Sequence, residues 1–115
     1  MEHNMKLCKE PFDMISNGKK TIELRLFDEK RKLVKVGDTI VFTSLDDINK
    51  KVKTEVKAIH RFESFEELYE KLPLDKCGYK NSETAKPEDM LEYYSKDEQK
   101  RYGVVGIEIK VIENC

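Results

Sequence analysis

Hydrophobic and polar residues alternate in several short stretches of the chain, and this alternation predicts β-strands. The clearest case is the segment 20–26, where aliphatic residues at every second position predict a half-buried strand with one charged face (Ile22, Leu24 and Leu26 are the aliphatic residues). A shorter alternation around Met5 and Leu7 predicts an opening strand. β-branched stretches predict three further strands, within 39–44, 52–62 and 102–112.

Helix signals lie between these strands. Pro11 suits the first turn of a helix that ends at Asn17-Gly18. Ser64 and Glu67 form a capping box before a second helix, which Pro73 ends. Pro87 predicts a third helix, with three side chains facing the core (Met90, Leu91 and Tyr94). The remaining connections are predicted to be a charged turn or loop at 28–32, a tight turn at 36–38, a hairpin connection at 46–51 and a polar loop at 75–84.

The predicted order is strand, helix, three strands, two helices, strand. Short strands with short connections favour antiparallel pairing, so we expect a small mixed α+β domain, mostly antiparallel, that forms a partly closed β-barrel with flanking helices. With 115 residues, the chain is long enough for one hydrophobic core but not for two separate ones. We therefore expect a single domain over residues 1–115.

Charge narrows the possible functions. The chain has 22 basic and 23 acidic residues, a net charge of −1, which excludes a protein that holds nucleic acid by bulk charge alone. The charges are nevertheless segregated. Residues 1–61 carry 14 basic and 10 acidic side chains (14 − 10 = +4), and residues 62–115 carry 8 and 13 (8 − 13 = −5). Such segregation can produce a basic face on a nearly neutral protein.

Cysteines, histidines and apolar runs exclude several classes of site. The three cysteines are widely spaced (Cys8, Cys77 and Cys115), and no pair of them forms a CxxC. With His3 and His60 also far apart, we expect no metal site, no cofactor and no disulfide framework. No apolar run has the length of about 20 residues that a membrane-spanning helix needs, and the N-terminus lacks the pattern of a signal peptide. We expect a soluble cytoplasmic protein that does not contact membranes.

Three charged residues in the predicted strand at 20–26 are the strongest candidates for chemistry. Glu23 and Arg25 project from the same strand face, and Lys20 lies where the chain enters the strand. An arginine can bind a phosphate or carboxylate through two hydrogen bonds, and a glutamate can accept a hydrogen bond from a base amine or act as a general base. The competing interpretation is an ion-pair ladder on an exposed strand face.

The segment 18–25 contains the pattern Gly-x-Lys-x-x-Glu-x-Arg, which resembles the GxKxxExR motif of the ASCH domain family. Segments 35–42 and 101–109 resemble the Gly-Asp turn and the C-terminal strand of that family, so the resemblance covers essentially the whole chain. It implies a PUA-like β-barrel with a cleft lined by the motif. It also implies binding of RNA or of a modified nucleoside or nucleotide, in RNA metabolism or translation-linked regulation.

The same resemblance leaves an enzyme as the alternative. A bacterial branch with a similar fold hydrolyses N4-acetylcytidine with a lysine and a threonine of this motif and a glutamate outside it. The lysine corresponds to Lys20, whereas the threonine position is occupied by Glu23, and Thr21 lies two residues away from it. Candidates for the third role are four nearby glutamates (Glu63, Glu66, Glu67 and Glu70). Lys20 and Glu23 are the catalytic candidates of an amidohydrolase or ribonuclease. A protein-interaction adaptor that uses the acidic half is the third possibility.

Further RNA contacts are predicted next to the motif. A basic cluster follows the motif, formed by Lys30, Arg31, Lys32 and Lys35. With three lysines of the 50–53 segment, this cluster could border an RNA cleft (Lys50, Lys51 and Lys53). Aromatic side chains could stack on unpaired bases, and we expect Tyr79 and one of Tyr93 and Tyr94 to be exposed. The predicted ligand-binding set is therefore Lys20, Glu23, Arg25, Lys30, Arg31 and Lys32.

Overall fold

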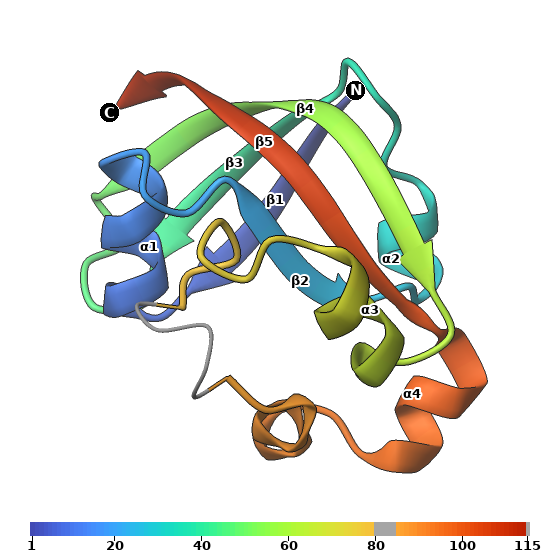
Figure 1. Cartoon of the computed structure of the whole chain (residues 1–115). Helices are drawn as coiled ribbons and strands as arrows, with labels where there is room; N and C mark the ends of the chain where they lie inside the picture. The colour runs from blue at the N-terminus through green and yellow to red at the C-terminus, as the bar shows by residue number, and fades with distance from the viewer. Residues whose placement is uncertain (80–84, 115) are drawn as a thin grey trace.

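A curled sheet of five strands, a half-barrel, forms the centre of the protein (Figure 1). The computed structural model describes residues 1–79 and 85–114. The strands are β1 (Glu2–Leu7), β2 (Ile22–Leu26), β3 (Thr39–Ser44), β4 (Lys51–Phe62) and β5 (Val104–Asn114). Their order is β1-β3-β4-β5-β2, with β1 and β3 parallel and the other neighbours antiparallel. The predicted mixed, mostly antiparallel α+β fold is confirmed.

The half-barrel is open between its two edge strands, β1 and β2. Curling of the sheet brings these edges within reach of each other, since the Arg25 side chain on β2 donates a hydrogen bond of 3.0 Å from Nη2 to the main-chain oxygen of Lys6 on β1. We call this opening the β1–β2 seam. Side-chain hydrogen bonds therefore cross the seam, where a closed barrel would have a main-chain ladder.

Two hydrophobic clusters hold the helices against the sheet. The first fills the concave side of the half-barrel and includes Phe12 and Ile15 from α1 (Lys9–Ser16). The second lies on the other face of β2, where α3 (Phe65–Lys71) covers Ile22, Leu24 and Leu26. Leu24 is 7% exposed, as expected for a residue on the buried face of the strand.

The helix starts follow the predicted signals. Pro11 lies in the first turn of α1, and Asn17 and Gly18 follow its last residue. At α3, the Ser64 side chain accepts a hydrogen bond from the backbone N–H of Glu67, as in the predicted N-cap. The segment after Pro87 forms a 3₁₀ helix, η2 (Pro87–Glu92).

Three local predictions were wrong. The charged turn at 28–32 forms a single helical turn, α2 (Glu29–Lys32), because the Asp28 carboxylate caps the N–H of Arg31. A further helix, α4 (Lys96–Tyr102), was not predicted, although Ser95 and Glu98 form a reciprocal capping box at its start. In η2, Met90 is buried but Leu91 is 41% exposed, because adjacent residues of a 3₁₀ helix point about 120° apart.

The loop predicted at 75–84 lies partly outside the described residues, which stop at Tyr79 and resume at Ala85. Its described part is a set of turns that folds back on β2, because the Lys76 carbonyl accepts hydrogen bonds from the N–H groups of Thr21 and Ile22. Tyr79 was expected to be exposed but packs against the second hydrophobic cluster, whereas Tyr93 is 64% exposed, as predicted for one of the pair. No helix within residues 1–79 and 85–114 is long and apolar enough to cross a membrane.

Candidate functional site

The Gly18–Arg25 motif connects α1 to β2 and brings its three charged side chains together. Gly18 has a φ of +82°, a conformation that favours glycine, and it turns the chain from the helix towards the strand. Lys20 Nζ then lies 2.8 Å from Glu23 Oε1. Arg25 donates from Nε and Nη2 to Glu23 Oε2, at 3.1 and 3.0 Å. The three charged side chains of the motif therefore meet at Glu23.

The charged face of β2 is buried, which argues against the competing interpretation of an ion-pair ladder on an exposed strand face. Glu23 is paired in register with Ile107 and Arg25 with Val105, and both of these β5 residues belong to the first hydrophobic cluster. Since paired residues on neighbouring strands share a face, Glu23 and Arg25 project to the concave side of the half-barrel. The side chain of Glu23 is 3% exposed, and those of Lys20 and Arg25 are 10% and 15% exposed. A carboxylate this deeply buried stays charged only with partners.

The ion pairs fix the protonation of the motif. Burial acts to raise the pKa of Glu23, but the charges and hydrogen bonds of Lys20 and Arg25 outweigh it and hold the pKa below its ordinary value. Burial acts to lower the pKa of Arg25, and Glu23 and Tyr94 outweigh it, so this pKa is raised. The motif is therefore a charged network at neutral pH, with both oxygens of Glu23 engaged.

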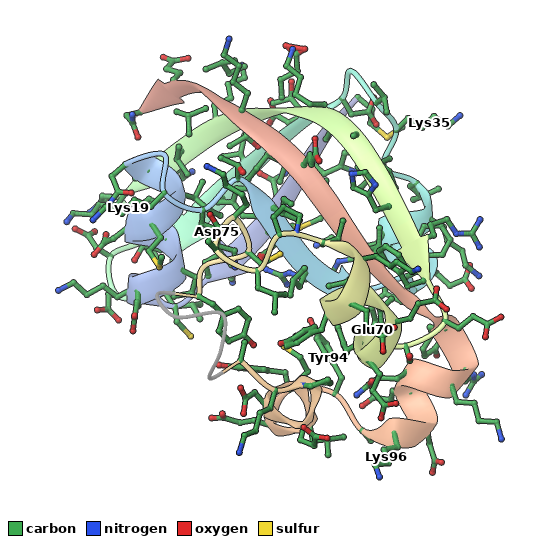
Figure 2. The ribbon with its side chains drawn as sticks, viewed as in Figure 1. Lys19, Lys35, Glu70, Asp75, Tyr94 and Lys96 are labelled. Carbon is green, nitrogen blue, oxygen red and sulfur yellow. The ribbon has the colours of Figure 1, made fainter. Side chains whose placement is uncertain are left out.

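Residues far away in sequence enclose this network. Cys77 is a buried thiol whose pKa is raised to about 11 by burial, with Lys20 acting in the opposite direction. Gly78 lies against the aliphatic part of Lys20, where an added Cβ would be 3.1 Å from Lys20 Cδ. Tyr94 extends from the segment after η2 towards α3 (Figure 2). Its hydroxyl interacts with Arg25. Burial raises the pKa of Tyr94, so its hydroxyl is a neutral hydrogen-bonding group.

The β1–β2 seam next to the motif is lined by further cations. Arg25 reaches the Lys6 carbonyl there, and Lys30 Nζ donates a hydrogen bond of 2.8 Å to the main-chain oxygen of Asn4. Arg31 pairs with Asp28 at 3.1 Å. Burial, followed by the charges of Arg31 and Arg25, lowers the pKa of Lys30, with Lys6 adding to the effect. Several positive groups therefore lie close together with few carboxylates between them.

The other predicted basic residues lie elsewhere. Lys32 pairs with Glu29 at 3.5 Å and lies over the Phe27 ring, 6.0 Å from its centroid. Lys51 and Lys53 are on β4, where Lys53 is paired in register with Val41 and is part of the outer face of the half-barrel. Of the predicted basic cluster, the structure brings Lys30 and Arg31 to the motif, but not Lys32.

The glutamates proposed for a hydrolase do not reach the motif. All four are exposed (Glu63, Glu66, Glu67 and Glu70). Three of them line a separate groove of about 830 Å³ between α3, η2 and α4 (Glu63, Glu66 and Glu67). A second hollow of about 320 Å³ is lined by Lys20 and Thr21, but not by Glu23 or Arg25. The motif side chains therefore contact one another and do not line one common cavity. Among the described residues, no group of three or more His, Cys, Asp or Glu side chains could hold a metal ion.

Sequence reasoning missed the groups around the motif that come from other elements, above all Lys6, Asp28, Cys77 and Gly78. Asp28 had a detectable signal, because an aspartate three residues before Arg31 fits an N-cap. Lys6 and Cys77 had none, since only the curling of the sheet and the fold-back of the 74–78 turns place them beside β2.

Comparison with known proteins agrees with the fold and with the family. The model of the ASCH domain family matches residues 5–113. The crystal structure of hypothetical protein PH0355 is 38% identical, with a TM-score of 0.82, and the match covers 97% of this chain and 100% of that one. The solution structure of protein PF0455 from Pyrococcus furiosus is also 38% identical, with a TM-score of 0.71 and coverage of 98% and 99%.

More distant structures share the fold alone. The ASCH protein from Zymomonas mobilis is 15% identical, with a TM-score of 0.67, and the match covers 98% of this chain and 71% of that one. No curated protein sequence matches the chain significantly. The family model spans nearly the whole sequence and the fold matches solved ASCH structures, so this chain belongs to the ASCH domain family.

Proposed function

We propose that this protein binds single-stranded RNA or a modified nucleotide at the β1–β2 seam, beside the buried motif. The observation that carries the proposal is the position of Arg25, which binds Glu23 on one side and reaches the seam on the other, where Lys30 and Arg31 lie. A row of cations at an open sheet edge suits a phosphate backbone, since phosphate contacts supply most of the affinity in nucleic-acid binding. The RNA class itself comes from the family resemblance.

Binding is favoured over hydrolysis by the state of Glu23. A general base works best with a pKa near the operating pH, and the pKa of Glu23 is lowered from the ordinary carboxylate value. Its oxygens already accept hydrogen bonds from Lys20 and Arg25, so abstraction of a proton would first require these bonds to break. Together with the missing threonine, this argues against an amidohydrolase that depends on the motif.

The test measures affinity for a single-stranded RNA against salt concentration. The logarithm of affinity should fall with the logarithm of salt concentration, with a slope of about −0.7 per neutralised phosphate. Arg31→Ala should weaken binding and reduce the slope by up to about 0.7. Lys96→Ala, which removes an exposed lysine from α4 (Figure 2), should leave both unchanged. Salt-independent affinity, or equal effects of the two variants, would contradict the proposal.

A turnover assay separates binding from catalysis. The wild-type protein is incubated with an N4-acylated cytidine and, separately, with RNA, and products are measured by chromatography. We expect no product. Product formation that Lys20→Ala abolishes, with the variant still folded by circular dichroism, would replace the binding proposal with a hydrolase.

A further inference from the structure

The cations of the seam differ in how far their charge is already compensated. Lys20 and Arg25 share Glu23, and Arg31 pairs with Asp28. Within the described parts of the chain, neither Lys6 nor Lys30 forms an ion pair. Lys30 is held instead by a main-chain oxygen, and Lys6 is exposed at the edge of β1. The seam therefore retains two lysines without an ion pair, beside a motif in which two cations share one carboxylate.

Two side-chain donors, Arg25 Nη2 and Lys30 Nζ, lie next to each other along β1. We call the interval between these two donors the gap. Arg25 Nη2 lies at the Lys6 carbonyl and Lys30 Nζ at the Asn4 carbonyl. These carbonyls are two residues apart on one strand, so they are separated by about 7 Å at roughly 3.3 Å per residue. One phosphate group fits between two donors at this spacing when each N···O distance is roughly 2.8 Å. The Lys6 side chain belongs to the same stretch of strand.

Two further observations favour the binding of an anion beside Lys30 and Arg31. The pKa of Lys30 is lowered by burial and then by the neighbouring cations Arg31, Arg25 and Lys6, with Asp28 opposing them. A bound anion would offset the repulsion between Lys30 and these cations and would raise the pKa of Lys30. In addition, Nε of Arg31 is buried without a hydrogen-bond partner among the described residues. Buried donors normally have hydrogen-bond partners. A small rotation of the Arg31 side chain towards a bound anion would give Nε an acceptor.

We propose that the gap between Arg25 and Lys30, with Lys6 at its rim, is a subsite for a terminal phosphate monoester of the bound RNA or nucleotide. The inference rests on the proposed function and names the part of the ligand that the seam selects. A phosphate monoester carries about −1.5 to −2 charges at pH 7, whereas an internal phosphodiester carries one. The two positive charges of Lys6 and Lys30 match the charge of a monoester. Beside a diester, which carries one negative charge, one of the two lysines would have no partner.

The experiment compares a hexauridylate with a 5′-hydroxyl, the same RNA with a 5′-phosphate or a 3′-phosphate, uridine 5′-monophosphate and inorganic phosphate, all by calorimetry at one salt concentration. At least one terminally phosphorylated RNA should bind about tenfold more tightly than the hydroxylated RNA. Lys6→Ala and Lys30→Ala should each weaken binding of the phosphorylated RNA more than binding of the hydroxylated RNA, and so remove most of this preference. Both side chains are exposed, so both variants should fold, and Lys96→Ala serves as the control.

The dependence on pH gives an independent readout. The second ionisation of a phosphate monoester lies near pH 6, so the preference for phosphorylated RNA should grow between about pH 5 and pH 7. The protein groups that act electrostatically on Lys30 or Arg25 are Lys6 from β1, Glu23 from β2, Asp28 and Arg31 around α2, and Tyr94. Lys20 and Arg25 hold the pKa of Glu23 below its ordinary value, so the second ionisation of the ligand phosphate is the change that we expect to act in this range.

The outcomes separate this inference from the function on which it rests. Equal affinity for hydroxylated and phosphorylated RNA, with normal salt dependence, would overturn the subsite and leave RNA binding intact. Binding of inorganic phosphate or uridine 5′-monophosphate that is lost in Lys30→Ala, without RNA binding, would support the subsite and overturn RNA as the ligand. Failure of every probe to bind would overturn both.

Discussion

Replacing Glu23 by glutamine removes the negative charge that holds Lys20 and Arg25 and keeps nearly the same side-chain volume. Removal of one partner from a buried ion pair typically costs about 3–5 kcal/mol, because the remaining charge is left uncompensated. Glu23 is 3% exposed, but Lys20 and Arg25 keep 10% and 15% of their side-chain surface and can regain part of their hydration. We therefore expect Glu23→Gln to lower the free energy of unfolding by about 3 kcal/mol at pH 7.

Urea denaturation followed by circular dichroism measures this loss, since a domain of this size is expected to unfold in one step. Lys20→Met and the double variant Lys20→Met/Glu23→Gln complete a double-mutant cycle, in which we expect a coupling energy of about 1–3 kcal/mol. A loss below about 1 kcal/mol for Glu23→Gln would refute the reasoning. The pair would then behave like an exposed ion pair in spite of its burial.

The pH dependence of the same variant follows from the lowered pKa of Glu23. A carboxyl group with a lower pKa in the folded state stabilises the protein above its unfolded pKa, which is about 4.3 for glutamate. That stabilisation disappears as the pH falls through the folded pKa. The difference in stability between wild type and Glu23→Gln should therefore be constant from pH 7 to pH 5 and shrink in more acidic solution. A difference that grew below pH 4 would contradict the assignment.

Three further variants test the packing and charge of the fold by denaturation. Leu24→Ala should cost about 2–5 kcal/mol, because Leu24 is buried in the second hydrophobic cluster, and a near-neutral effect would contradict the placement of β2. Gly106→Ala places a Cβ 2.6 Å from Leu72 Cδ1 and should cost about 1–3 kcal/mol; adding Leu72→Ala should recover part of the loss. Asp38→Asn should lower the melting temperature much more at pH 6 than at pH 2, where the carboxyl is about half protonated, because hydrogen bonds from His3 and Lys35 N–H lower the pKa of Asp38 to about 2; an equal effect at both pH values would refute this.

The sequence predicted β2 well because its aliphatic residues follow the two-residue period of a strand. It did not predict that Glu23 is buried, because the pattern of one strand reports the polarity of each face and not what covers it. The cover comes from β5, from Cys77 and from Tyr94, which are brought to β2 only by the curl of the sheet and by turns far along the chain. An exposed ion-pair ladder therefore stayed open as an alternative until the structure was known.

The helices show the same division between local and long-range information. The N-cap of α3 was predictable because Ser64 and Glu67 carry their signal within four residues. The capping box of α4 was equally local and could have been found at Ser95 and Glu98. The exposure of Leu91 could not, because it depends on whether the segment after Pro87 winds as an α-helix or as a 3₁₀ helix against α3.

Arg25 connects the buried motif to the β1–β2 seam. A guanidinium has five N–H groups in a fixed plane, so it can bind a carboxylate with one edge and reach another acceptor with the rest. Arg25 uses Nε and Nη2 on Glu23 and extends Nη2 to the Lys6 carbonyl across the seam. A lysine is a point charge on a flexible chain and would have to leave one of these acceptors. The buried carboxylate therefore acts through Arg25, because it fixes the position of a cation at the open edge of the half-barrel, as the proposed binding surface requires.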